Sequence, residues 1–181
     1  MSQGKIAHKK TTIDGITFDS KMEAQYYLYL KEEQKAGRVK SFTLQPVFDL
    51  QPKYFVLNGE QVTVCNMEYY NKKDKERKAF NKANPENKVK IVQGITYIAD
   101  FDVIYADGSR KIIDPKGIKT TDFKLKEKMF NFKYPHLTLE CVTYDSSSKM
   151  WLSYEEYQKV KKERAKNKPK KKPSPRKRRR K

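Results

Sequence analysis

The sequence predicts a mixed fold of the α/β or α+β class, in which one mixed sheet is flanked by helices. Three observations favour it: an amphipathic helical pattern near the N-terminus, several short extended segments in the middle, and a second helical pattern followed by another extended segment. An order of helix, strands, hairpin, helix and strand is typical of helices packed on the faces of one sheet. The chain has no internal repeat.

Three segments have helical patterns, over Ser20–Ala36, over Thr121–Lys133 and from Ser153 onward. Ser20 can cap the first helix, and Gly37 follows it where a left-handed residue is favoured. Thr120, Thr121 or Asp122 can cap the second. That helix must stop before Pro135. Ser153 and Glu156 form a capping-box pattern for the third.

Extended segments are rich in β-branched and aromatic residues and are separated by Pro, Gly and Asp. They cover Val39–Leu44, Val47–Leu50, Tyr54–Leu57, Val62–Cys65, Ile95–Tyr105, Lys111–Asp114 and Leu137–Thr143. Residues 71–90 are polar, with eight basic and three acidic side chains. We interpret them as an inserted segment, partly helical at most, that is either a second nucleic-acid arm or a soluble loop. The charge favours the arm.

The charge is concentrated at the C-terminal end of the 181 residues. Lys and Arg total 41 against 22 Asp and Glu, a formal net charge of +19. Residues 159–181 hold 15 basic residues and one acidic residue, so +14 lies there and +5 in the rest. Pro169, Pro173 and Pro175 prevent regular structure in this segment. We therefore expect a domain at 1–157 and a basic tail at 158–181, where the last helix ends and disorder follows.

Several classes of protein are excluded by composition. No stretch approaches the roughly 20 apolar residues that span a bilayer, and the first ten residues lack the apolar region of a signal peptide. Cys65, Cys141, His8 and His136 give neither a disulfide framework nor zinc-ligand spacing, which favours a reducing cytoplasm. The seven glycines are not clustered into a phosphate-binding loop. The charge indicates a polyanionic partner, nucleic acid before an anionic membrane surface.

Two acidic residues and a lysine lie in the predicted hairpin and are candidates for a functional site. Asp100 lies in an apolar run, and Asp114 and Lys116 end the returning strand. A two-residue Asp107–Gly108 loop would put Asp100 opposite Pro115, whereas a three-residue loop with a left-handed Gly108 puts Asp100 opposite Asp114. In the second register, which we predict, Asp102, Asp114 and Lys116 share one face.

This grouping favours a metal site. Buried carboxylates are costly unless they are paired or bind a metal. Mg²⁺ prefers oxygen ligands and keeps several waters, so two carboxylates and one backbone carbonyl suffice. Lys116 projects to the same face as Asp114. There its ammonium can orient or help to deprotonate an attacking water and offset phosphate charge.

Asp100 and Asp114-Pro115-Lys116, with Glu23 on the first helix, resemble the signature of the PD-(D/E)XK nuclease superfamily, and more closely a small phage-encoded family within it. The resemblance covers roughly residues 10–145. It implies a restriction-endonuclease-like αβββαβ core and Mg²⁺-dependent cleavage of DNA, with Mn²⁺ able to substitute. By this analogy Asp100, Asp114 and the Pro115 carbonyl bind the metal and Lys116 assists the water. Glu23 joins through water or a second ion.

The same resemblance suggests Gln45 and Asp102 as auxiliary residues, and the sequence departs from it in places. Ala99 stands where the motif has proline. Pro115 lacks the N–H that a strand ladder uses, so we expect the strand to fray there.

Simpler interpretations exist for each residue. Ser20–Glu23 is a capping box by itself, so Glu23 can be only a helix cap. An Asp-x-Lys triplet is usually an exposed pair, and Asp102 can be a polar edge residue. Tyr26 and Tyr97 fall on core-facing positions. We expect Trp151 to seal the last helix onto the body.

We therefore hypothesise a magnesium-dependent endodeoxyribonuclease, phage-encoded and acting in the host cytoplasm on branched DNA such as a Holliday junction. Resolving a junction needs two active sites, hence a homodimer. The alternatives are a non-catalytic DNA-binding accessory protein, a nicking or end-cleaving subunit of a larger complex, and an RNA-binding protein. The basic tail also resembles a nuclear localisation signal. The expected nucleic-acid contacts are Lys72, Lys73, Lys75, Arg77, Lys78, Lys119, Lys170, Lys171, Lys172, Arg176, Lys177, Arg178, Arg179, Arg180 and Lys181.

Overall fold

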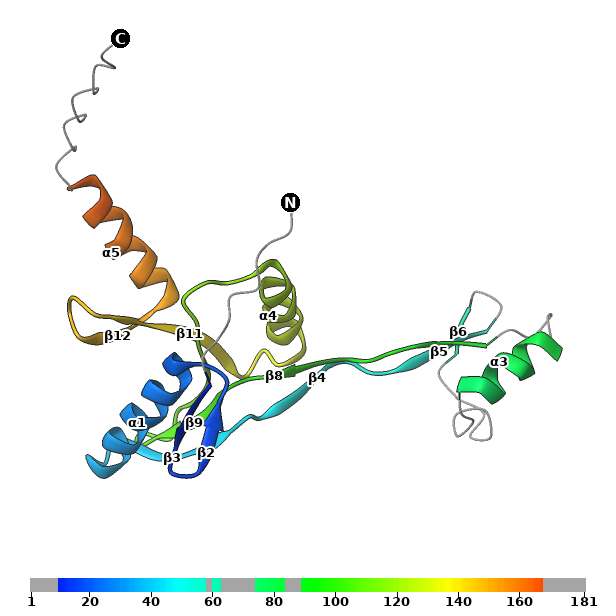
Figure 1. Ribbon diagram of the computed structural model, residues 1–181, viewed down its shortest axis with the longest axis horizontal. Helices are drawn as coiled ribbons and strands as arrows, with labels where there is room; N and C mark the ends of the chain where they lie inside the picture. Colours follow the sequence, from blue (N-terminus) through cyan, green and yellow to red (C-terminus); the bar gives the residue numbers. More distant parts are fainter. Residues whose placement is uncertain (1–9, 58–59, 63–73, 84–88, 168–181) are drawn as a thin grey trace, which may run out of the picture.

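The computed structural model describes residues 10–57, 60–62, 74–83 and 89–167 (Figure 1). Its helices are α1 (Lys21–Lys35), α3 (Asp74–Ala83), α4 (Thr121–Lys133) and α5 (Tyr154–Lys166). Its strands are β1 (Thr11–Ile13), β2 (Ile16–Phe18), β3 (Val39–Leu44), β4 (Val47–Gln51), β5 (Tyr54–Leu57), β6 (Glu60–Val62), β7 (Val89–Val92), β8 (Ile95–Ile98), β9 (Phe101–Tyr105), β10 (Arg110–Pro115), β11 (Thr138–Asp145) and β12 (Met150–Ser153).

The centre of the molecule is a mixed five-stranded sheet with the strand order β12-β11-β10-β9-β3. Among the described strands of this sheet only β10 and β11 run parallel, and α4 makes the crossover between them. Ile112 and Ile113 are adjacent in β10 and fully buried in two different hydrophobic clusters, because alternate side chains of a strand face opposite sides. One cluster lies under α1 and the other under α4. The predicted α/β class, a mixed sheet flanked by helices, is therefore confirmed.

Aromatic side chains dominate both clusters. Under α1, Tyr26 packs edge-on against Phe101, with ring centroids 5.3 Å apart. Under α4, Phe130 is fully buried and packs edge-on against Phe48 at 4.9 Å. Pairs of this geometry add about 0.5–1.5 kcal/mol each to the stabilisation that burial of their area provides. These clusters fix the helices on the sheet and, with them, the ends of β9 and β10.

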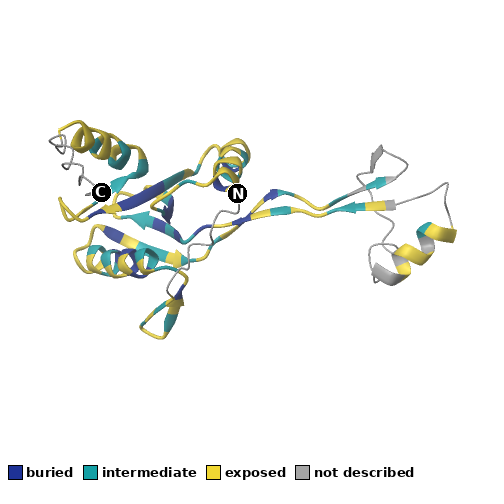
Figure 2. Cartoon of the chain, turned by 45° about the horizontal axis from the view of Figure 1, so that its top comes forward, coloured by how far each residue is buried: buried dark blue, intermediate teal, exposed yellow. Residues whose placement is uncertain are grey.

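A long two-stranded ribbon leaves this body and forms an arm (Figure 1). The pairing of β3 with β9 matches Leu44 with Phe101, and the pairing of β4 with β8 continues the same register from Val47 opposite Ile98. Beyond a register shift near Gln51, β5 pairs with β7 and β6, and α3 lies at the far end. Figure 2 shows the buried residues concentrated in the body, while the arm is mostly exposed or intermediate.

Most predicted elements are observed with nearly the predicted bounds. Ser20 caps α1 by accepting a hydrogen bond from the Glu23 N–H, and Gly37 is left-handed with φ 75°. Thr120 caps α4, and Ser153 with Glu156 makes the predicted capping box. None of the helices in the described ranges is long and apolar enough to cross a membrane.

Other elements differ from the prediction. The hairpin β1–β2 was not predicted, although Asp14-Gly15 between β-branched residues is a hairpin signal. Strand β12 was not predicted either, and Trp151 within it packs edge-on against Tyr26 of α1, with ring centroids 4.8 Å apart. Within the inserted segment α3 is a regular ten-residue helix. The strand expected at Val62–Cys65 is β6, which ends at Val62, and residues 63–65 lie outside the described ranges.

Candidate active site

The hairpin between β9 and β10 has the predicted three-residue loop. The Tyr105 N–H donates to the Ser109 carbonyl at 2.8 Å, and Gly108 has φ 84°. The last matched pair is Ile113 with Phe101, and one further step along both strands sets Asp114 opposite Asp100. The register that the metal-site hypothesis required is therefore the observed one.

The predicted run from Ile95 to Tyr105 is two strands, and the break between them lies at Asp100. Strand β8 pairs with β4 in the arm ribbon, and β9 pairs with β3 and β10 in the body. Across the break the Gln45 N–H donates to the Asp100 carbonyl at 3.0 Å, and the Ala99 N–H donates to the Pro46 carbonyl at 3.1 Å. Gln45 is left-handed, with φ 50°. Asp100 thus sits where the ribbon bends out of the sheet, and not inside a strand.

The chain from Asp114 to Lys116 is held firmly by β11. Asp114 pairs with Cys141, and the Lys116 N–H donates to the Val142 carbonyl at 2.9 Å. The Thr143 hydroxyl donates to the Lys116 carbonyl at 2.6 Å. Pro115 is buried within β10, so the expected fraying is wrong. Because successive N–H groups of a strand alternate in direction, the donor that Pro115 lacks would face the β9 side, where the matched pairs end at Ile113.

The two carboxylate oxygens of Asp114 have very different surroundings. The side chain is only 1% exposed. Its Oδ2 accepts a hydrogen bond from the Tyr97 hydroxyl at 2.7 Å and contacts the Lys116 ammonium in a close ion pair. Its Oδ1 is buried and has no hydrogen-bond partner among the described residues. A buried carboxylate oxygen without a partner is costly, so this atom is a ready acceptor for a ligand.

The Lys116 ammonium lies between the buried acid and solvent. Its side chain is 33% exposed, and the nitrogen lies 4.5 Å from the centre of the Phe123 ring. A cation over an aromatic face is attracted by the negative π-cloud of the ring. Lys116 is therefore held in place by Asp114 and Phe123 and keeps an exposed side from which it can donate.

A cavity of about 90 Å³ brings Glu23, Gln45 and Asp100 together. Its remaining walls come from β2, the end of β3 and the start of β9. Glu23 also serves the helix, because its Oε2 accepts a hydrogen bond from the Asp19 N–H at 3.2 Å. Glu23 therefore makes a local hydrogen bond just before α1, although not to the Ser20 N–H that a capping box uses, and it lines the same cavity as Asp100.

The electrostatic environment of Glu23, Asp100 and Asp114 disfavours full ionisation of these acids when no cation is bound. Burial, then the negative charges of Asp114 and Glu23, and lastly a side-chain interaction with Asp114 raise the pKa of Asp100 to about 9, while Lys116 opposes this shift. Burial and the charge of Asp114 raise the pKa of Tyr97, so its hydroxyl keeps its proton and acts as a donor. A cation placed among these carboxylates would relieve their mutual repulsion.

The residues fit a hard divalent cation with few protein ligands. Within the described ranges no three His, Cys, Asp or Glu side chains form a ready-made ligand group. Asp100 and Asp114 nevertheless directly follow the last matched pair of β9 and β10 and interact electrostatically, and Asp114 has an oxygen without a hydrogen-bond partner among the described residues. Mg²⁺ commonly binds through one or two carboxylates and keeps waters in its remaining positions. The oxygen donors of Asp100, Asp114 and the Pro115 carbonyl suit such an ion.

Two predicted residues are engaged elsewhere. Asp102 accepts two hydrogen bonds from the Arg110 guanidinium, at 2.9 and 2.7 Å, so it is part of a bidentate ion pair. The Lys119 side chain is 9% exposed, and its ammonium lies 2.9 Å from Glu127 and 2.8 Å from Glu155. These two carboxylates neutralise Lys119, and we leave it out of the proposed DNA contacts.

The other predicted nucleic-acid contacts lie on the arm and the tail. Lys75, Arg77 and Lys78 belong to α3, and the Lys78 side chain is exposed. The remaining predicted contacts lie outside the described residues, and they are Lys72, Lys73, Lys170, Lys171, Lys172, Arg176, Lys177, Arg178, Arg179, Arg180 and Lys181.

Tyr97 is the residue of this site that the sequence assigned only to the core. Alternation correctly puts its ring inside, and the residue is buried. A buried tyrosine hydroxyl needs a hydrogen-bond partner. This requirement indicates that a core-facing Tyr97 has a polar neighbour. The sequence did not show that the partner is Asp114, because Tyr97 lies in β8 and Asp114 in β10, which do not pair.

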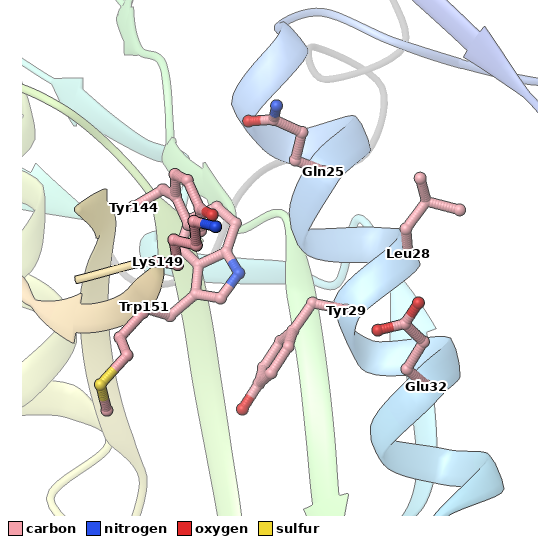
Figure 3. Close-up of a pocket in the computed structure, with 8 residues that line it drawn as sticks. Gln25, Leu28, Tyr29, Glu32, Tyr144, Lys149 and Trp151 are labelled. Atoms are coloured by element: carbon pink, nitrogen blue, oxygen red, sulfur yellow. The ribbon is translucent and has the colours of Figure 1, made fainter. Parts of the chain in front are cut away.

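A larger hollow of about 470 Å³ lies between α1 and the β11–β12 hairpin, and neither Asp100 nor Asp114 lines it. Figure 3 shows Gln25, Leu28 and Tyr29 of α1 across from Tyr144 and Trp151. Its charged lining residues are one glutamate, Glu32, and one lysine, Lys149. It therefore lacks the paired carboxylates of the first site.

The comparison with known protein families places most of the chain in a described family. The profile described as a protein of unknown function, DUF1064, matches residues 3–150. No curated protein and no solved structure matches the chain. The matched range includes every residue of the cluster around Asp114. Because it covers more than half of the sequence, the chain belongs to the DUF1064 family.

Proposed function

We propose that this protein is a metal-dependent DNA endonuclease with a restriction-endonuclease-like fold. The observation that carries the proposal is Asp114: a carboxylate that is fully buried, opposite Asp100, bound to Lys116, and left with one oxygen without a partner. A buried acid in this state is better explained by an absent ligand than by a structural role, because structural carboxylates have their hydrogen bonds satisfied. Asp145 is such a structural case, with hydrogen bonds from Arg164 and Ser148.

The proposed ligand is Mg²⁺, with Mn²⁺ as a substitute. Asp100, Asp114 through Oδ1, and the carbonyl of Pro115 would hold it, and Glu23 would contribute through water or a second ion. Bound there, the ion would supply positive charge to the scissile phosphate and lower the pKa of an attacking water.

Lys116 is the residue that we assign to the water. Its ammonium is anchored to Asp114 and Phe123, and its exposed side faces solvent. From this position it can donate a hydrogen bond to the nucleophilic water or to a phosphate oxygen, and so stabilise the negative charge that develops in the transition state. Gln45, held in a left-handed conformation at the same cavity, can orient a second water through its amide.

The rest of the chain provides positive charge for a polyanion. On the arm the side chains of Lys78, Lys82 and Lys90 are exposed. The sequence from 168 to 181 adds ten basic residues. Contacts of this kind bind phosphates and do not read bases, so we propose a substrate recognised by shape. Branched DNA such as a Holliday junction, cut by a phage-encoded homodimer, fits this description.

A second candidate is a DNA-binding accessory protein that has the fold without catalysis, or a nicking or end-cleaving subunit that acts inside a larger complex. The absence of a three-residue ligand group within the described ranges favours it. Such a protein would bind DNA equally well after Asp114→Asn.

The test is a cleavage assay with labelled four-way junction, flap, linear duplex and single-stranded DNA, each in Mg²⁺, Mn²⁺ or EDTA. Wild type, Lys116→Ala and Lys124→Ala are compared, because Lys124 is an exposed lysine on α4 and its replacement removes the same positive charge. We expect metal-dependent cutting by wild type and Lys124→Ala only.

Paired symmetrical cuts confined to the junction would support a resolvase. Equal cutting by Lys116→Ala would refute the role of this lysine. If no substrate is cut while all three proteins bind DNA tightly, the accessory function replaces the enzyme.

A further inference from the structure

We propose that Tyr97 is a positioning residue that holds Asp114 in the orientation needed for metal binding. The proposal rests on the function proposed above, because the ion is the one assigned to Asp100 and Asp114. It concerns a residue outside the acids and the lysine, on a strand of the arm ribbon.

The first step is the division of labour between the two oxygens of Asp114. Both donors that reach the carboxylate, the Tyr97 hydroxyl and the Lys116 ammonium, bind the same oxygen, Oδ2. Oδ1 is left buried without a partner in the described part of the chain. Two donors converging on one oxygen fix the rotation of the carboxylate, so that the other oxygen is the one presented to a ligand.

The second step is the rigidity of Tyr97 itself. Its side chain is buried, and its ring packs edge-on against Phe123 and Phe130 of α4, with centroid distances of 6.0 Å in both cases. The strand that carries it pairs with β4, where Phe48 is its partner. The hydroxyl is therefore placed by packing and does not have to be ordered when a ligand binds.

The third step is a comparison of the two donors. Lys116 is partly exposed and can swing toward a water or a phosphate during the reaction, whereas Tyr97 cannot leave. If Lys116 turns away, the tyrosine alone keeps Oδ2 occupied and Oδ1 in place. Hydrogen bonds to metal-binding carboxylates have this orienting role, and their loss costs about 10–100-fold in metal affinity or activity.

The test is Mn²⁺ binding to the full chain without DNA. The free Mn²⁺ is measured by its electron paramagnetic resonance signal. The variant is Tyr97→Phe, which removes one oxygen and keeps the packing. The matched control is Tyr134→Phe, since the Tyr134 hydroxyl donates to the Asp49 carbonyl at 3.0 Å beside the same helix and does not touch Asp114. Asp114→Asn defines the signal that belongs to the site, and thermal unfolding of each variant reports on the fold.

We expect Tyr97→Phe to raise the Mn²⁺ dissociation constant about tenfold, and Tyr134→Phe to leave it within about twofold. Wild-type affinity in Tyr97→Phe would overturn the positioning role and leave the metal site standing. An equal loss of affinity in both tyrosine variants would also overturn it, because the effect would then be a general loosening of the core. If wild type itself binds no Mn²⁺ that depends on Asp114, the metal site and the proposed function fail together.

Discussion

Replacing Asp114 with Asn should stabilise the metal-free protein, although the residue is one of the most buried in the molecule. Asn keeps an oxygen that can accept from Tyr97 and Lys116. Its amide can donate toward Asp100 from the position where Oδ1 now has no partner. The substitution therefore removes a buried charge and a repulsion and loses few contacts.

The magnitude follows from the charges. Two ionised carboxylates at a separation of about 4 Å would repel by about 4 kcal/mol at an effective dielectric constant of 20, and the raised pKa of Asp100 reduces this repulsion because it favours the protonated form of that acid. The Lys116 ammonium, in contact with the same acid, offsets part of this repulsion. We expect a net gain of about 1–2 kcal/mol, which corresponds to a rise in Tm of about 3–6 °C for a domain of this size.

The assay is urea and thermal unfolding in EDTA and again in Mg²⁺. In EDTA Asp114→Asn should be the more stable protein. At a Mg²⁺ concentration ten times its dissociation constant the wild type should gain about 1.4 kcal/mol, and the variant should gain nothing.

The matched control is Asp145→Asn, because Asp145 is also buried but has its partners in Arg164 and Ser148, and its replacement should destabilise. If Asp114→Asn is destabilised in EDTA like the control, Asp114 is a structural anchor and the reasoning from its free oxygen is wrong.

Three further predictions follow from other parts of the molecule. The hydrogen bonds from Arg164 and then Ser148 lower the pKa of Asp145. The ionised carboxylate therefore stabilises the fold above the unfolded pKa of about 3.9, and this stabilisation is lost as pH falls through the lower folded pKa. The Tm difference between wild type and Asp145→Asn should shrink below about pH 4, and a constant difference would contradict this. Gln45 has φ 50°, so Gln45→Val should be less stable than Gln45→Gly by about 1–2 kcal/mol in urea, and equal stability would show that the backbone there relaxes. Residues 168–181 hold ten basic side chains. Removing them should reduce the magnitude of the slope of log affinity for duplex DNA against log salt concentration by up to about 9. An unchanged slope would exclude phosphate contacts by the tail.

Local signals in the sequence were sufficient for much of the fold. The caps at Ser20 and Thr120 and the box at Ser153 each depend on a few neighbouring residues, and all three are observed. The Ala106–Gly108 loop was decided by the need to bring Asp100 opposite Asp114, and its three-residue form is observed. The caps do not require knowledge of distant contacts, whereas the loop residues allow two registers and the choice between them rests on the metal-site hypothesis.

What could not be predicted depends on contacts between distant segments. The run from Ile95 to Tyr105 reads as one strand, and only its pairing with β4 on one side and β10 on the other shows that it bends at Asp100. Pro115 was expected to disturb its strand, but the direction of its missing donor depends on which neighbour lies on which side. The link from Tyr97 to Asp114 is of the same kind, since their strands do not pair.

The central claim is that Asp114, Asp100 and Lys116 form a metal-dependent hydrolytic site. The most direct measurement is the single-turnover rate of DNA cleavage by wild type and Lys116→Ala, with protein in excess over a four-way junction, first in EDTA and then after Mg²⁺ is added. We predict no cleavage in EDTA, cleavage by wild type once Mg²⁺ is present, and a rate about 10²–10⁴-fold lower for Lys116→Ala with unchanged DNA binding. Equal rates for the two proteins, or no cleavage by a folded wild type that binds both Mg²⁺ and DNA, would contradict the account.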